Sequence, residues 1–126
     1  MKFILPIFRL GLGGPLGSGR QWMSLIHIND VIGLIIHCLN QNQLTGPVNA
    51  VLPEPIRNID FTRTLGRVVH RPAIFPVPKI LIRTALGGLS HVILDSARVL
   101  PKVAIQSNYQ WEFPTTEHAL KSVALL

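Results

Sequence analysis

The chain has 126 residues, of which 48% are hydrophobic and only 14% are charged, and it carries a formal net charge of +6. This composition excludes a disordered chain. It predicts a small folded unit that packs against a partner or against the rest of a larger fold. The longest nearly unbroken apolar stretch, residues 31–39, is far shorter than the roughly 20 residues of a membrane-spanning helix, so we expect no membrane contact.

Along the first half of the chain, apolar spacing predicts alternating helix and strand. In chain order we expect the end of a helix, a glycine-rich loop, a strand, a helix and a short strand, at residues 2–10, 11–19, 21–28, 30–41 and 48–52. The helix at 30–41 is apolar nearly all round, which predicts burial on several sides. It contains the only cysteine, Cys38, which we expect to be a buried, inert thiol in a reducing compartment.

Proline and glycine divide the second half into short segments. We expect three helices, then a strand, then a last helix, at residues 60–70, 79–86, 90–100, 109–113 and 117–125. The first of these helices turns Phe61, Leu65, Val68 and Val69 inward, and Gly87 with its neighbour ends the second. Strand–helix alternation followed by a mostly helical back half places the chain in the α/β class with few short strands.

The segment GLGGPLGSGRQW, residues 11–22, has five glycines in its first nine positions. Its spacing approaches the phosphate-binding loop G-x-x-x-x-G-K-[ST], but Arg20 and Gln21 replace the lysine that reaches the phosphates and the hydroxyl that holds magnesium. The dinucleotide pattern G-x-G-x-x-G fails as well, because Leu16 stands where its last glycine should be. We therefore expect glycines that allow turns and close backbone approach.

The segment IHIND, residues 26–30, is the best local candidate for ligand contacts. His27 stands at the end of the predicted strand and Asp30 at the start of the predicted helix, where α/β folds place ligands. The alternative is structural: a strand-end histidine, followed by a helix that Asn29 or Asp30 caps. The histidines show no zinc spacing and the carboxylates form no local acid–base pair, so we expect no metal site.

Three arginines recur at every fourth position, which places Arg63, Arg67 and Arg71 on one face of a helix. With the net positive charge, this stripe allows a nucleic-acid contact. Aromatic residues are few and are not interleaved with the basic ones, so a stacking platform for bases is not evident. A solvated helix face is the favoured interpretation.

Four stretches of the chain resemble the epimerase family proteins of the short-chain dehydrogenase/reductase superfamily. They are FRLGLGGPLGSGRQWMSLIHINDVIGLIIHCL, LTGPVNAVLPEPIRNIDFTRTLGRVVHRP, SARVLPK and YQWEFPTTEHALKSV, in that order and with similar spacing. The resemblance implies the C-terminal portion of an extended short-chain dehydrogenase/reductase fold. Residues 1–52 would be a remnant of the substrate side of the Rossmann-like domain, and residues 53–126 the small C-terminal helical domain.

The resemblance also implies NADP(H) as cofactor of the full-length family, with none bound by this chain alone, because the family's glycine motif and Tyr-x-x-x-Lys region precede this segment. The only tyrosine, Tyr109, is followed at position 113 by phenylalanine instead of lysine, so we expect no catalytic residue here. Arg20 suits an anionic substrate group, and Gln21 and His27 can supply neutral hydrogen bonds. Asp30 is expected to cap its helix.

Three functions stay open. The favoured one is the substrate-side part of an NAD(P)-dependent epimerase or oxidoreductase, inactive alone, whose full-length form acts on a small molecule. The second is a non-enzymatic module that binds a partner or self-associates through apolar surface left by the missing Rossmann half. The third is a basic nucleic-acid binder, although we expect no nucleic-acid partner. The expected location is intracellular, either mitochondrial or cytoplasmic.

Overall fold

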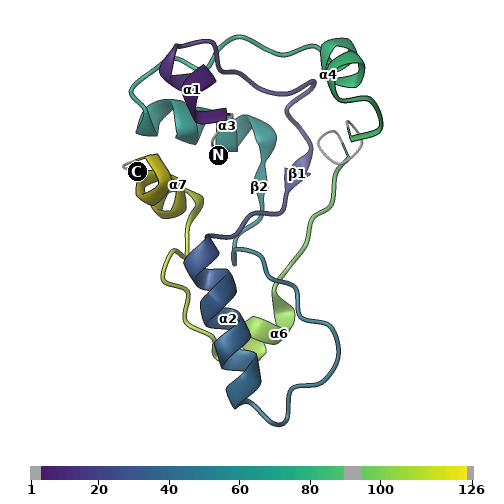
Figure 1. Cartoon of the computed structure of the whole chain (residues 1–126), viewed down its shortest axis with the longest axis vertical. Coiled ribbons are helices and arrows are strands. Elements are labelled where there is room, and N and C mark those ends of the chain that lie inside the picture. Colours follow the sequence, from purple (N-terminus) through teal and green to yellow (C-terminus); the bar gives the residue numbers. More distant parts are fainter. Residues whose placement is uncertain (1–3, 90–94, 125–126) are drawn as a thin grey trace.

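The computed structural model describes residues 4–89 and 95–124 as short helices joined by long extended segments (Figure 1). Its elements are α1 (Ile4–Arg9), β1 (Trp22–Met23), α2 (Ile28–Asn40), β2 (Ile56–Arg57), α3 (Asn58–Val68), α4 (Lys79–Leu86), the 3₁₀ helix η1 (Gly87–Leu89), α6 (Lys102–Gln106) and α7 (Thr116–Ala124). Helices α1, α3 and α7 gather at one end of the molecule and α2 and α6 at the other, with β1 and β2 between them (Figure 1). A few short strands with a mostly helical back half match the predicted class.

The core lies where α1 and α7 pack against α3. Phe61 and Leu65 of α3 are 6% and 0% exposed, which confirms their predicted inward positions. Val68 and Val69 are partly buried against the same cluster. The other buried members come from α1 and α7: Leu5, Phe8 and Leu120. Residues near both ends of the chain therefore close one core.

The sheet is a two-stranded antiparallel ribbon, smaller than the predicted strands implied. Its register pairs Trp22 with Arg57 and Met23 with Ile56. The predicted strand at 21–28 keeps only two residues, and the one predicted at 48–52 is irregular, although the Leu52 N–H donates to the Leu25 carbonyl at 2.7 Å. A strand needs a neighbour for its backbone groups, and the described residues supply one to these two segments only along this short ribbon, while an isolated parallel bridge joins Leu16 to Val77 elsewhere.

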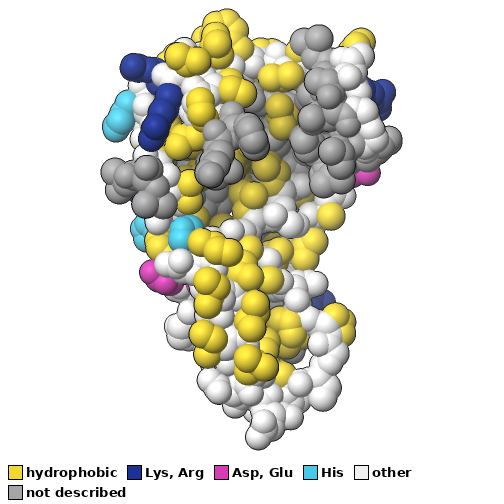
Figure 2. Space-filling view, in the orientation of Figure 1, with side chains coloured by type: hydrophobic (Ala, Val, Ile, Leu, Met, Phe, Trp, Pro, Cys, Tyr) yellow, Lys and Arg dark blue, Asp and Glu magenta, His cyan; other side chains and the backbone are white. Residues whose placement is uncertain are grey.

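Helix α2 is covered on one side only. Asp30 and Leu34 are buried on the covered side, and Cys38 is half-buried. The uncovered side carries five large apolar side chains, between 52% and 75% exposed, which we call the α2 stripe: Ile28, Ile32, Ile35, Ile36 and Leu39. Figure 2 shows many hydrophobic side chains on the part of the molecule where Figure 1 places α2. The prediction of burial on several sides is thus wrong, because the described segments pack against one side.

In the second half, the helices marked by strong local signals are where the sequence predicts them. Helix α4 occupies the predicted 79–86, and its end falls at Gly87, whose φ of 52° is easily adopted by glycine. Helix α7 lies within one residue of the predicted 117–125. Within residues 4–89 and 95–124, none of the helices has the length and apolar content that a bilayer crossing requires.

Two predictions for the second half are wrong, and one helix was missed. Residues 95–100 are not helical, while residues 90–94 of the predicted helix lie outside the described residues. Residues 109–113 form an irregular segment instead of a strand. Helix α6 begins directly after Pro101, whose carbonyl accepts a hydrogen bond from the Ile105 N–H at 3.0 Å. A five-residue helix is too short to show a clear apolar period.

The glycine-rich loop lies against residues 75–77. The Phe75 N–H donates to the Gly13 carbonyl at 3.3 Å, and the Gly17 N–H donates to the Val77 carbonyl at 2.9 Å. A Cβ on Gly14 would collide with the Phe75 carbonyl oxygen, and Gly17 has a φ of 59°. Close backbone approach and turns are thus what these glycines provide, as predicted.

Candidate functional site

Gln21 is held inside the loop that leads into β1. Its side chain is 7% exposed, and its Nε2 donates to the Leu16 carbonyl at 3.0 Å. The Leu16 N–H in turn donates to Oδ1 of Asn58 at 2.8 Å, and the Asn58 N–H donates to the Gln21 carbonyl at 2.9 Å. This closed set of bonds holds the residues before β1 against the start of α3. The side-chain nitrogen of Gln21 is therefore used in a hydrogen bond within the chain.

Two arginines that the sequence reasoning missed, Arg57 and Arg98, lie against the segment that carries Arg20. Arg20 is exposed, and its backbone carbonyl accepts a hydrogen bond from Nη1 of Arg57 at 3.0 Å. The guanidinium carbons of Arg57 and Arg98 lie 4.5 and 5.1 Å from the ring centroid of Trp22. The Trp22 N–H donates to Oγ of Ser96 at 3.0 Å, which holds the Arg98 segment beside β1.

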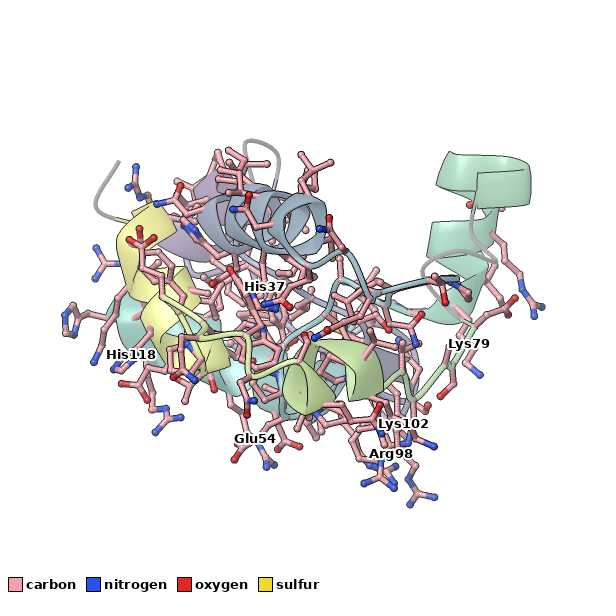
Figure 3. The ribbon with its side chains drawn as sticks, turned by 90° about the horizontal axis from the view of Figure 1, so that it is seen from below. His37, Glu54, Lys79, Arg98, Lys102 and His118 are labelled. Atoms are coloured by element: carbon pink, nitrogen blue, oxygen red, sulfur yellow. The ribbon has the colours of Figure 1, made fainter. Side chains whose placement is uncertain are left out.

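We call Arg20, Trp22, Arg57 and Arg98 the arginine cluster. Figure 3 shows Arg98 at the outer surface of the molecule. Cation–π contacts keep the guanidinium groups of Arg57 and Arg98 near the indole, and their positive charges, with Arg20 two residues before Trp22 in the chain, favour an anion near this segment. No local sequence signal unites these residues, because they come from three segments brought together by the β1–β2 ribbon and by the Ser96 contact.

His27 caps α2 and lies apart from the arginine cluster. Its Nδ1 accepts the Asn29 N–H at 3.2 Å, which makes His27 the N-cap. The ring is 7% exposed and stacks on Phe113 with centroids 3.9 Å apart. Within the described ranges, no hydrogen bond or ring contact joins His27 to Arg20 or Gln21. The structure therefore gives His27 a capping contact, which the sequence analysis had assigned to its neighbours.

Asp30 is completely buried and anchors the segment at 109–113. Its Oδ1 accepts the Glu112 N–H at 2.7 Å and its Oδ2 accepts the Phe113 N–H at 3.0 Å. The Tyr109 hydroxyl donates to the Asp30 backbone carbonyl at 3.0 Å and lies 3.3 Å from Oδ1. The prediction that Asp30 caps α2 is corrected: it lies within the first turn, and its carboxylate is directed at another segment.

Tyr109 is held in an aromatic pocket between α2 and the end of α6. His37 and Trp111 contact its ring edge-on, with centroids 5.4 and 5.1 Å away. His37 extends from α2 toward α6 (Figure 3), and its Nε2 lies 2.9 Å from Oγ of Ser107. Burial, followed by the charge of Asp30 and its hydrogen bond, raises the pKa of Tyr109 to about 12.

The single tyrosine makes this shift directly measurable. The ordinary pKa is 10.0 and the folded value is about 12, so the fold favours the protonated hydroxyl. The stability it contributes is therefore fully present below pH 10 and lost as the pH rises through 12. Tyrosinate absorbance should titrate near pH 12 in the folded chain and near 10 in guanidinium. A folded midpoint at 10 would contradict the Tyr109–Asp30 contact.

Two apolar cavities open between α1, β1 and the helices around them. The larger, of about 330 Å³, is lined by apolar residues and by His27 and Thr116. The smaller, of about 120 Å³, lies beside the glycine loop. Both cavities are lined by Ile4, Met23 and Phe61, so they adjoin one another. Such apolar linings suit hydrophobic side chains or an apolar ligand group.

The predicted arginine stripe is incomplete. Arg63 and Arg67 lie on α3, but Arg71 lies beyond its end at Val68. Arg63 contacts the Asp60 carboxylate at 3.8 Å, Nη2 of Arg67 donates to Thr64 at 3.2 Å, and Nε of Arg71 donates to the Arg9 carbonyl at 3.2 Å. The contacts of Arg63 and Arg67 are local, whereas Arg71 binds the end of α1, and all three side chains lie at the solvated surface. Among the described residues, no group of three metal-ligating side chains is present.

The chain is similar to known proteins that are much longer than itself. A family described as "Domain of unknown function (DUF1731)" matches residues 77–123. The chain is 40% identical over 121 residues to the mouse (Mus musculus) epimerase family protein SDR39U1, covering 95% of this chain and 41% of that protein. A chloroplastic homolog from Arabidopsis thaliana is 33% identical over 123 residues, covering 98% of this chain and 35% of that one.

The fold has a solved counterpart. The human epimerase family protein SDR39U1 (isoform 2), crystallised with NADPH, matches with a TM-score of 0.94 at 36% identity. The match covers 99% of this chain and 43% of the human chain. This chain thus spans less than half the length of the relatives it matches.

Proposed function

We propose that this chain, which corresponds in sequence and fold to the C-terminal part of epimerase family proteins, supplies the substrate side of an NADP(H)-dependent epimerase or oxidoreductase. The observation that carries the proposal is the TM-score of 0.94 to a protein solved with NADPH. We assign residues 1–52 to the substrate side of the Rossmann-like domain and residues 53–126 to the small C-terminal domain. The substrate would be a small molecule with an anionic group.

The glycine loop of this chain does not fit the phosphates of a dinucleotide. Several of its N–H groups are already used, since Leu16 donates to Asn58, Gly17 to Val77 and Gly19 to Leu16. The backbone at Gly14 is pressed against Phe75, which leaves no room for a phosphate between them. A phosphate cradle needs N–H groups that are free to donate. We therefore assign NADP(H) binding to the portion of the family chain that lies outside this match.

A thermal-unfolding scan with and without NADPH tests this division of the family chain into a part that binds NADP(H) and a part that does not. A ligand that binds only the folded state raises the melting temperature. We expect NADPH to leave the melting temperature of the 126-residue chain unchanged and to raise that of the full-length human relative, which serves as the positive control. A rise for this chain alone would mean that it binds the dinucleotide, and the proposed division would be wrong.

On the substrate side, we assign the anionic group to Arg20, supported by Arg57, which binds its carbonyl, and by Arg98, which shares the Trp22 ring with Arg57. We also propose Gln21 and His27 as neutral contacts to the substrate. Nε2 of Gln21 is bonded within the chain, which leaves its carboxamide oxygen for a ligand. Nδ1 of His27 is likewise bonded within the chain, which leaves its Nε2. The guanidinium groups provide several donors in a planar fork that matches phosphate or carboxylate oxygens.

A titration with pyrophosphate examines the arginine cluster in the isolated chain. We expect it to shift the indole N–H signal of Trp22 in nuclear magnetic resonance spectra. Arg20→Ala should weaken this binding roughly threefold, about 0.7 kcal/mol, which is typical of an exposed charge pair. Arg83→Ala removes an equal charge from the exposed surface of α4 and should change the affinity little. If both variants weakened pyrophosphate binding equally, net charge alone would explain the effect, and the assignment to Arg20 would be wrong.

We also propose a reducing intracellular location, mitochondrial or cytoplasmic, supported by a single half-buried cysteine and no possibility of an internal disulfide. Microscopy of the tagged full-length protein would test it.

A further inference from the structure

A hollow with a basic lining, which we call the basic hollow, opens where α3 ends. Its volume is about 770 Å³, and it is lined by α3 and the segment at 70–74. Four basic side chains lie on its wall, all of them exposed: Arg63, Arg67, His70 and Arg71. None of its described lining residues belongs to the two apolar cavities or to the arginine cluster. Figure 2 shows Lys or Arg and His side chains together at the upper left, where Figure 1 places α1 and α3.

The turn after α3 places two of these side chains on the wall. His70 has a φ of 54°, the left-handed conformation that glycine adopts most readily after the end of a helix. Its N–H donates to the Arg67 carbonyl at 3.1 Å, and the Arg71 N–H donates to the Gly66 carbonyl at 2.9 Å. These bonds satisfy two of the last carbonyls of α3, which reduces the negative charge at that end. Holding a histidine in this conformation costs free energy, and residues held in this way cluster at binding sites.

Positive charge exceeds negative charge in the basic hollow. Its lining holds three arginines and one carboxylate, Asp60, which Arg63 contacts at 3.8 Å. The carboxylate of Glu117, on the neighbouring helix α7, is bonded to Lys121 at 2.7 Å, so its charge is balanced within its own helix. The excess of positive charge on a concave surface favours an anionic ligand.

Each of the three guanidinium groups keeps donors for such a ligand. Within the described ranges, their polar contacts use Nη1 of Arg63, Nη2 of Arg67 and Nε of Arg71. A guanidinium group has five N–H donors in a planar fork, so most of them stay available. Arg63 and Arg67 lie about one helical turn apart, roughly 6 Å along the axis, and can therefore contact more than one acceptor group of the same ligand.

We propose that the basic hollow binds a small compound with clustered phosphate groups, such as a di- or triphosphate, at a site separate from the proposed substrate site. A single carboxylate would balance only one of the positive charges, whereas linked phosphates bring several negative charges and acceptor oxygens to one place. The volume of about 770 Å³ lies within the range of roughly 300–1,000 Å³ that is usual for small-molecule sites. The described lining contains no phenylalanine, tyrosine or tryptophan, so the bases of a nucleic acid would have no stacking partner.

Titration of the 126-residue chain with inorganic tripolyphosphate, followed by nuclear magnetic resonance, tests the proposal. The backbone N–H signals of His70 and Ile74 report on the basic hollow, and the indole signal of Trp22 reports on the arginine cluster. We expect saturable shifts at His70 and Ile74 with a dissociation constant of about 1 mM, in keeping with exposed contacts. Arg63→Ala combined with Arg67→Ala should weaken this binding about tenfold, because each exposed charge contact contributes a factor of about three. The affinity measured at Trp22 should not change.

Lys79→Ala combined with Arg83→Ala is the matched control, because it removes two positive charges one helical turn apart from the exposed surface of α4. It should change the affinity at the basic hollow by less than about twofold. Equal weakening by the two pairs of substitutions, or the absence of a saturable shift in the wild-type chain, would overturn the proposal. So would a short single-stranded DNA that shifts the same signals at lower concentrations than tripolyphosphate. NADPH at the micromolar concentrations of a melting scan leaves a millimolar site empty, so the dinucleotide test stays independent.

His70→Gly separates binding from folding. Glycine adopts a positive φ without strain, so this variant should raise the melting temperature by about 3 °C. Because the imidazole lies on the wall of the basic hollow, the same variant should weaken tripolyphosphate binding about twofold. A gain in stability with unchanged affinity would contradict a role of His70 in the site. Circular dichroism of the arginine and lysine variants establishes that they remain folded.

Discussion

Asp30→Ala should lower the free energy of unfolding by about 3–5 kcal/mol, the largest effect expected of any single substitution here. The carboxylate is 0% exposed and accepts the N–H groups of Glu112 and Phe113. Alanine would leave both donors, and the Tyr109 hydroxyl beside them, short of an acceptor in a buried place. Urea unfolding followed by circular dichroism measures the change.

Asp60→Ala is the control for this substitution. Asp60 also lies in the first turn of a helix, but its side chain is 54% exposed and its contact with Arg63 is 3.8 Å long. Asp60→Ala should lower the free energy of unfolding by less than about 1 kcal/mol, because exposed ion pairs and helix-dipole contacts are weak. Equal losses at the two aspartates would mean that the anchor at 109–113 contributes little to stability.

Gly14→Ala should be the second most damaging substitution, by about 3 kcal/mol or more. The added Cβ would overlap the Phe75 carbonyl oxygen, and a backbone atom cannot swing away as the tip of a side chain can. The loop would have to separate from residues 75–77 and lose the bonds from Phe75 to Gly13 and from Val77 to Pro15. The same urea experiment would report the loss.

Gly88→Ala is the control, because it replaces a glycine with alanine where the added Cβ causes no steric clash. A Cβ at Gly88 meets no atom within 4 Å, so alanine should change the stability by no more than about 0.5 kcal/mol. If Gly14→Ala were equally mild, the close contact between the glycine loop and Phe75 would not exist in solution.

Local sequence signals predicted the helices well. Helix α4 was predicted with its observed bounds, because a proline-rich segment precedes it and Gly87 ends it. Helices α2, α3 and α7 were found within two residues by their apolar period. These features depend on neighbours within one or two turns, which a single sequence records.

Features that depend on distant residues could not be predicted. Nothing near Asp30 indicates that its partners lie 82 and 83 positions later, and this anchor is what makes it an acceptor for another segment instead of a cap. Arg57 and Arg98 likewise reach Trp22 only through the chain's folding. The predicted strands at 48–52 and 109–113 failed because strand formation depends on a neighbouring strand that the sequence does not specify.

The separation between Asp30 and its anchor has a consequence for synthesis on the ribosome. Translation adds about 5–20 residues per second, so the 82 residues between Asp30 and Glu112 take roughly 4–16 s to appear. Throughout that interval α2 carries its five bare apolar side chains without the segment that fixes the helix. Leu120, a member of the core cluster, emerges later still. Because Leu120 packs in the same core as Leu5 and Phe61, the nascent chain keeps the apolar residues of that core unpacked for seconds before their last partner is made.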